Sequence, residues 1–294
     1  MPENISTISL TDGRHLSIIE AGVPDGIPVL TLHGTPGSRL IAPSWVEDAH
    51  SRGIRLISYD RPGYGGSSPH PGRSVASVTE DVAALAEQLG IDRLFVWGIS
   101  GGGPHALACA ALLPELVPAV ASLASPAPYP ADGLDWFAGM GEDNIVEFNA
   151  ALESREAVEK FIEAQTPGLL GADAKGIVAE LSSLLSAADA AVLTEDYASF
   201  MIDRMNEGIK DRRDGWIDDD IAFTKPWGFE LDQIKTPLLL MQGALDKFVP
   251  FAHGEWLAAR IPGAEARLLP DDGHLTLTAN RIPEVHTWLL DKMG

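Results

Sequence analysis

A serine flanked by glycines is the first candidate for chemistry in this chain. Ser100 stands in the run Gly-Ile-Ser-Gly-Gly at 98–102, between an apolar, β-branched stretch at 94–97 and a helical run of small residues at 103–113. A serine between strand and helix sits on a tight turn, which strains its backbone and lifts its hydroxyl clear of the sheet. Glycines on both sides avoid Cβ clashes with the neighbouring strand and helix. Taken alone, the run fits an idle glycine-rich turn equally well.

An acid and a base for such a serine follow two later strands. A hydroxyl nucleophile needs a base to accept its proton and a third group to orient that base. Asp246 comes after the apolar run 237–241, and His274 comes after the run 264–269. Sites in open parallel sheets form at the carboxyl ends of the strands, so we expect Ser100, Asp246 and His274 to meet there. Their order along the chain matches that of one hydrolase fold.

Other carboxylates and histidines compete for these roles. Asp60 follows an early strand and suits the bracing of nearby loops. Asp271 and Asp272 stand next to His274 and would have to fold back sharply to reach it. This favours Asp246 as the acid. Of the seven other histidines, His33 suits the bracing of its loop, and His105 lies within the helix after the serine. We expect His253 and His286 on helix surfaces or in packing.

A tetrahedral intermediate also needs hydrogen-bond donors for its oxyanion. The backbone N–H of Gly101, directly after the serine, begins a helix and is expected to point into the site. The second donor should come from the loop after residues 29–32, which reads His-Gly-Thr-Pro-Gly-Ser. We favour the backbone N–H of Thr35, with that of Gly34 as the alternative. The same loop also suits capping of the helix that follows it.

The elements that must position these residues alternate between strands and helices. Continuous apolar strands alternating with helices predict a parallel sheet covered on both faces. Strands are predicted at 5–10, 16–21, 29–32, 54–59, 93–98, 117–124, 237–241 and 264–269, and helices near 38–52, 77–89, 103–113, 251–261 and 277–292.

The alternation stops at three prolines between residues 126 and 130. Residues 135–221 then look helical and lack strand-like runs. This break divides the chain into a first core part at 1–125, a helical cap at 126–232 and a second core part at 233–294.

The block 126–232 carries −15 of the net charge of −21. We expect its acids to form a solvated surface that aids solubility. Its aromatic and methionine side chains are expected mostly to pack, with a few facing a ligand cavity between cap and core, which indicates a mostly apolar substrate. They are Trp136, Phe137, Met140, Phe148, Phe161, Tyr197, Phe200, Met201, Met205 and Trp216.

Composition excludes several classes of partner. The net charge of −21 would repel nucleic-acid backbones and anionic lipid surfaces. The sequence has no apolar run of about 18 residues, so we expect no membrane span. The N-terminal residues do not resemble a signal peptide. The single cysteine, Cys109, is expected to be a buried structural thiol. These features predict a cytoplasmic protein acting on a small molecule, and they do not indicate its oligomeric state.

These motifs together resemble the α/β-hydrolase superfamily over about residues 5–125 and 233–294. The resemblance implies a mostly parallel sheet flanked by helices, with an inserted helical cap over the site. It rests on the loops at 33–34 and 60–67 and on Ser100, Asp246 and His274. The loop 33–37 also resembles that of proline iminopeptidases, although Thr35 stands where those enzymes usually have glycine. No acidic cap residue can be matched to their amine-binding groups.

The sequence thus predicts a serine hydrolase that cleaves a small, mostly apolar carboxylic ester or related acyl compound through an acyl-enzyme, with no metal or organic cofactor. The alternatives are a C–C, lactone or amide hydrolase or a lyase on the same triad, and a receptor-like protein that binds a ligand and turns it over slowly. Dehalogenase and epoxide hydrolase chemistry is disfavoured, because those relatives use a carboxylate nucleophile where this chain has Ser100.

Overall fold

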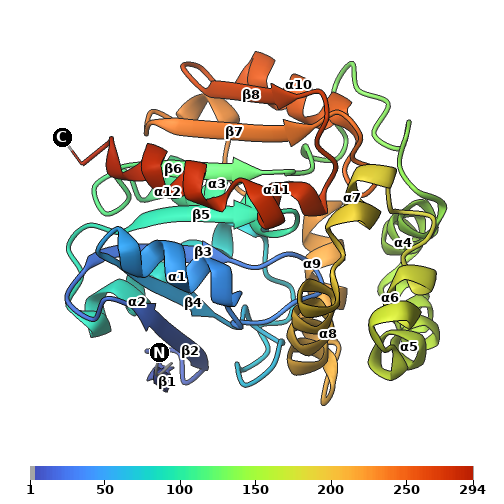
Figure 1. The fold of residues 1–294 in the computed structure, drawn as a ribbon, viewed down its shortest axis with the longest axis horizontal. Coiled ribbons are helices and arrows are strands. Elements are labelled where there is room, and N and C mark those ends of the chain that lie inside the picture. The colour runs from blue at the N-terminus through green and yellow to red at the C-terminus, as the bar shows by residue number, and fades with distance from the viewer. Residues whose placement is uncertain (1–3, 294) are drawn as a thin grey trace.

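Within residues 4–293, which the computed structural model describes, eight strands form one sheet in the order β1-β2-β4-β3-β5-β6-β7-β8 (Figure 1). Their bounds are β1 (Asn4–Ser9), β2 (His15–Gly22), β3 (Ile27–Leu32), β4 (Ile54–Tyr59), β5 (Phe95–Ile99), β6 (Val120–Leu123), β7 (Leu238–Gly243) and β8 (Glu265–Leu269). β2 pairs antiparallel with both β1 and β4, and all other neighbours are parallel. The predicted sheet is therefore confirmed as mostly parallel, with an antiparallel edge.

Helices cover both faces of this sheet, as the alternation predicts. Outside the region between β6 and β7 they are α1 (Pro43–Ser51), α2 (Val78–Leu89), α3 (Gly102–Leu112), α10 (Phe251–Arg260), α11 (Leu275–Asn280) and α12 (Ile282–Leu290), with the short 3₁₀ helix η1 (Val75–Ser77). A second 3₁₀ helix, η2 (Leu231–Gln233), lies just before β7.

Two hydrophobic clusters fill the two sides of the sheet. Successive side chains of a strand point to opposite faces, so Val29 and Leu30 of β3 belong to different clusters. Val29 packs on the side covered by α1, α11 and α12, which contribute Trp45 and Trp288 among others. Leu30 packs on the side covered by α2, α3 and α10. Burial on both faces explains why the central strands read as continuous apolar runs.

Prolines account for two differences from the predicted helices. The helix expected at 38–52 begins at Pro43, and the closing helix expected at 277–292 is two helices, α11 and α12, with Pro283 in the first turn of α12. Proline lacks a backbone N–H and has a fixed φ, so it is favoured in the first turn of a helix, where that N–H needs no partner in the helix.

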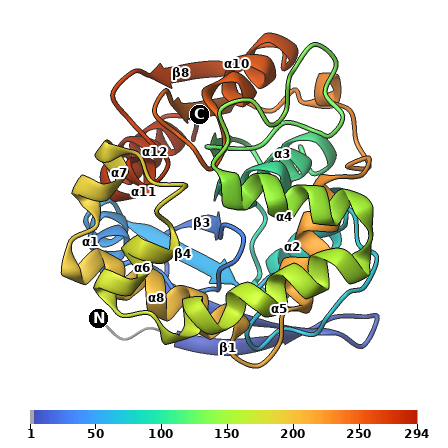
Figure 2. The ribbon, with the colours of Figure 1, turned by 90° about the vertical axis from the view of Figure 1, so that its right-hand side faces the viewer.

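The predicted helical block is confirmed as an insertion between β6 and β7. It contains α4 (Glu142–Glu153), α5 (Arg155–Gly171), α6 (Ala174–Glu180), α7 (Ala187–Val192), α8 (Glu195–Ile209) and α9 (Asp214–Phe223). These helices gather on one side of the sheet, toward which the parallel strands point (Figure 1), and Figure 2 shows α4, α5, α6 and α8 in front of β3 and β4. All of them except α7 contribute to a third hydrophobic cluster, which also includes Tyr64 from the core. The boundaries at 125/126 and 232/233 stay predictions.

The described helices include none that is both long enough and apolar enough to span a bilayer. Three of the N-terminal residues considered for a signal peptide, Met1 to Glu3, lie outside the described part of the chain.

Candidate active site

Ser100 sits on a strained turn between β5 and α3. Its φ is +55°, a left-handed conformation that is costly for a residue with a Cβ. Its backbone N–H donates to the carbonyl of Leu123 at 2.9 Å. A Cβ on Gly98 would meet the carbonyl oxygen of Gly102, and a Cβ on Gly102 would meet that of Leu32. Glycine at both positions is therefore what allows strand and helix to approach this closely.

The predicted acid and base form a hydrogen-bonded pair. Nδ1 of His274 lies 2.7 Å from Oδ2 of Asp246. The other carboxylate oxygen, Oδ1, accepts the backbone N–H groups of Phe248 at 2.8 Å and Val249 at 2.9 Å, and Gln242 donates to Oδ2 at 3.1 Å. These bonds fix the carboxylate. The ring of Phe248 stacks on the imidazole with centroids 4.5 Å apart, so the imidazole is held in one plane.

The electrostatics of this pair favour a protonated imidazole. Burial lowers the pKa of His274, but the charge and hydrogen bond of Asp246, with a smaller contribution from Asp189, outweigh it, so the pKa of His274 is raised above its ordinary value. A base with such neighbours accepts a proton more readily than an isolated buried histidine.

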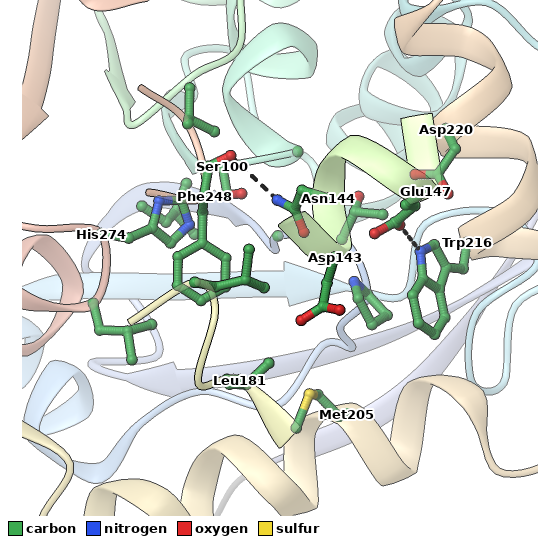
Figure 3. Close-up of a pocket in the computed structure, with 18 of the residues that line it drawn as sticks. Ser100, Asp143, Asn144, Glu147, Leu181, Met205, Trp216, Asp220, Phe248 and His274 are labelled. Atoms are coloured by element: carbon green, nitrogen blue, oxygen red, sulfur yellow. Dashed lines mark hydrogen bonds between the residues drawn. The ribbon is translucent and has the colours of Figure 1, made fainter. Parts of the chain in front are cut away.

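The structure brings the predicted nucleophile, the predicted base and the predicted oxyanion donors to one cavity, which Asp246 itself does not line. Figure 3 shows Ser100 and His274 at this cavity. Gly34, Thr35 and Gly101 also line it. A Cβ on Gly34 would lie 3.5 Å from the Cβ of Ser100, so the loop passes close to the serine. Within residues 4–293, neither the backbone N–H of Gly101 nor that of Thr35 donates a hydrogen bond to another protein group. Both remain candidates for oxyanion donors.

A cap residue that sequence reasoning missed anchors this loop. The hydroxyl of Thr35 donates to Oδ2 of Asp219 in α9 at 2.7 Å. Arg61 donates to the same oxygen at 2.6 Å and to the carbonyl of Gly34 at 3.2 Å. Asp219 is fully buried and also accepts from Tyr64 at 2.9 Å and Arg73 at 2.6 Å. The cap thus connects to the loop at residues 33–37 through one carboxylate.

The expected solvated surface is therefore wrong for the run 218–220, whose three aspartates are all buried. The charge count of the cap does not reveal that Arg61 and Arg73, which belong to the core, form ion pairs with Asp219. A buried charge is tolerated when it is paired and hydrogen-bonded.

The competing residues occupy structural positions. Asp60 accepts from Arg39 and from the backbone of Gly66, and Asp272 pairs with Arg281 at 2.7 Å. His33 accepts the N–H of Arg61 at 3.1 Å and lies 2.7 Å from the carbonyl of Gly34, so it braces the loop as predicted. The remaining side chains are buried: His105, His253, His286 and Cys109. Burial raises the pKa of the Cys109 thiol to about 12.

Most of the cap's aromatic and methionine side chains face the cavity, contrary to the expectation that only a few would. All ten except Phe137 line it. Sequence periodicity shows which residues are apolar, but it does not show that several cap helices turn those faces toward the same space. The apolar wall indicates a cavity that prefers apolar groups.

Two acidic groups at one end of the cavity were not foreseen. Glu147 of α4 and Asp220 of α9 lie next to each other, and Trp216 donates to Glu147 at 2.5 Å (Figure 3). Burial, followed by the neighbouring Glu147 carboxyl, raises the pKa of Asp220 well above its ordinary value. Like charges this close favour a shared proton. Among the described residues, no cluster of three or more His, Cys, Asp or Glu side chains suits a metal ion.

We expect Asp220→Asn to gain stability relative to wild type as pH rises. Asp220 binds its proton more tightly in the folded protein than in the unfolded chain. Its contribution to the free energy of unfolding therefore declines as pH rises from the unfolded-state pKa toward the folded-state pKa. The asparagine variant does not lose stability in this way. Its free energy of unfolding relative to wild type should rise by about 1.4 kcal/mol for each unit by which folding raises the pKa of Asp220. Urea unfolding at pH 4.5 and pH 8 measures it, and an equal difference between the proteins at both values would contradict the shared proton.

Comparisons with known proteins agree with this fold. A family model described as alpha/beta hydrolase fold matches residues 27–278. A probable proline iminopeptidase of Streptomyces coelicolor is 31% identical over 124 residues, 40% of this chain and 38% of that protein. A pimeloyl-[acyl-carrier protein] methyl ester esterase of Nitrosomonas europaea is 27% identical over 85% of this chain and 89% of that protein. The solved structure of a thermophilic esterase from Thermogutta terrifontis is similar in fold, with a TM-score of 0.69 and 21% identity over 99% of this chain and 100% of that one.

Proposed function

The chain belongs to the alpha/beta hydrolase fold family, and from this premise we propose that it is a serine hydrolase cleaving a small carboxylic ester or related acyl compound. The observation that carries the proposal is the hydrogen bond of 2.7 Å between His274 and Asp246, in a cavity that Ser100 shares with His274. A nucleophile, a base and a group that orients the base are the parts that acyl transfer needs.

In the proposed mechanism, Ser100 Oγ attacks the acyl carbon while Nε2 of His274 takes its proton. Asp246 holds Nδ1, which fixes the tautomer, and stabilises the imidazolium that forms. His274 then protonates the leaving group, and the acyl group remains on Ser100. Water attacks this acyl-enzyme with His274 again as the base.

We assign the backbone N–H groups of Gly101 and Thr35 as the hydrogen-bond donors to the developing oxyanion. Donors fixed before the reaction stabilise this charge without reorganisation. The bond from the Thr35 side chain to Asp219 supports Thr35 over Gly34 as the second donor, because it fixes that residue. We assign the cap to residues 126–232, and the core to 1–125 and 233–294.

A fluorophosphonate probe tests the proposal, because it phosphonylates an activated serine. We expect peptide mapping to place the probe on Ser100 and the labelled protein to lose ester turnover. Labelling without multiple-turnover catalysis would favour the receptor-like alternative. If the protein cleaves a lactone, an amide or a C–C bond but no ester, the assignment of the triad stands and the proposed substrate class is wrong.

We expect neutral short-chain acyl esters to be preferred over anionic ones. The cavity is about 200 Å³, lined mainly by apolar side chains, and carries the acidic groups Glu147 and Asp220. A carboxylate on the acyl chain should lower kcat/KM by about tenfold or more, since about 1.4 kcal/mol of repulsion has that effect. Matched p-nitrophenyl butyrate and mono-p-nitrophenyl succinate measure it. Preference for the succinate would contradict this and indicate that Arg204, which also lines the cavity, binds the substrate.

A further inference from the structure

A cap carboxylate reaches the loop that carries the base. Asp189 of α7 is fully buried, and its Oδ1 accepts the backbone N–H of Leu275 at 2.7 Å and that of Thr276 at 3.3 Å. These residues directly follow His274 and begin α11. α7 lies beside α11 in Figure 1. A cap side chain therefore satisfies backbone donors of the core next to the base.

The same carboxylate is held in place by its own helix. Its Oδ2 accepts the hydroxyl of Ser186 at 2.7 Å and the Ser186 backbone N–H at 3.3 Å, and the hydroxyl of Ser186 in turn accepts the N–H of Asp189. This is the capping box of α7. One carboxylate thus links the start of a cap helix to the start of a core helix.

Gly273, the residue before the base, lies against the carboxylate of Asp189. A Cβ on Gly273 would meet the carboxylate of Asp189. The loop and the cap are therefore fitted closely at this position, and movement of α7 away from the core would remove the partners of the Leu275 and Thr276 N–H groups.

The charged groups around His274 come from three elements. Asp246 follows β7 and bonds to the imidazole, and Asp189 of the cap acts on it through space. The neighbouring Asp272 turns away to pair with Arg281. Lys247, next to the acid, directs its ammonium toward the carbonyl of Leu185 at 3.4 Å. Asp189 is therefore a second source of negative charge at the base, supplied by the cap.

We propose that Asp189 is a positioning residue that couples the docking of the cap to the orientation and proton affinity of His274. This inference rests on the proposed role of His274 as the base. With the cap docked, the carboxylate fixes the loop and stabilises the imidazolium. With the cap displaced, the base loses both effects, so hydrolysis depends on cap closure.

The test replaces Asp189 with asparagine, which keeps the shape and the acceptor for Leu275 but removes the charge. We expect the pKa of the His274 imidazole, followed by NMR, to fall below that of wild type. The acidic limb of the kcat/KM profile should move to lower pH by the same amount, and its plateau should fall by about tenfold. The matched control is Asp173→Asn, which removes the charge of the exposed aspartate that caps α6 but keeps an acceptor oxygen for the N–H groups of Lys175 and Gly176. It should leave both readouts unchanged.

A merely structural role predicts a different result. If Asp189→Asn lowers the melting temperature but leaves the imidazole titration and the pH profile as in wild type, the proposal is overturned. If that variant does not fold, Ser186→Ala removes one bond that fixes the carboxylate and should shift the titration in the same direction. An unchanged titration in Ser186→Ala would then overturn it. The NMR titration needs no turnover, so failure of the serine mechanism, seen as activity in Ser100→Ala, is distinguished from failure of this inference.

Discussion

Replacing Ser100 with alanine is expected to lower kcat for a cleavable ester by roughly four to six orders of magnitude. The loss is large because the acyl-enzyme cannot form, while the cavity and the oxyanion donors remain. Steady-state turnover of p-nitrophenyl butyrate by the purified variant measures it, with circular dichroism to show that the fold is kept.

The matched control for this substitution is Ser125→Ala. Ser125 is buried, and its hydroxyl donates to the carbonyl of Pro126 at 3.0 Å. It should fold and turn over the ester with little change in kcat. Near-normal turnover by Ser100→Ala would reject Ser100 as the nucleophile.

Replacing Asp219 with alanine is expected to lower the free energy of unfolding by about 3–5 kcal/mol. The change leaves Arg61 and Arg73 buried without the carboxylate that each contacts at 2.6 Å. Removing one partner of a buried ion pair is costly because the other charge stays out of water. Urea unfolding at pH 7 measures the loss, and Asp203→Ala on the exposed side of α8 is the control.

The pH dependence gives this prediction a second readout. Burial raises the pKa of Asp219, but Arg61 and Arg73 outweigh it and hold the pKa well below its ordinary value. A depressed folded pKa stabilises the protein above the unfolded pKa of about 4, and this stability is lost as pH falls below it. The difference between wild type and Asp219→Ala should therefore shrink between pH 5 and pH 3. A loss below about 1 kcal/mol at pH 7 would show that the network is not what holds α9 to the core.

The sheet and the elements around the serine were predictable because their signals are local. The elbow at Ser100 needs glycine at two nearby positions, and its φ of +55° follows from that turn. The strands were recognisable because burial on both faces requires continuous apolar residues. The candidate acid and base follow from the rule that sites form where parallel strands end. Their roles in catalysis remain predictions.

The contacts made by the cap were not predictable in this way. Asp219 bonds to Thr35, 184 positions away in the chain, and Asp189 bonds to Leu275, 86 positions away. No periodicity or motif specifies such pairs, since they depend on how the cap docks on the core. The same docking turns aromatic side chains into the cavity and buries the aspartates at 218–220. A run of acids therefore looked like a solvated surface.

The most direct measurement is mass spectrometry of protein quenched with acid during steady-state ester turnover. The serine mechanism predicts an added acyl mass on the peptide that contains Ser100, formed and lost at rates consistent with kcat and absent from Ser100→Ala. Sustained turnover with no acyl group on that peptide, or with the acyl group on a different side chain, would contradict it.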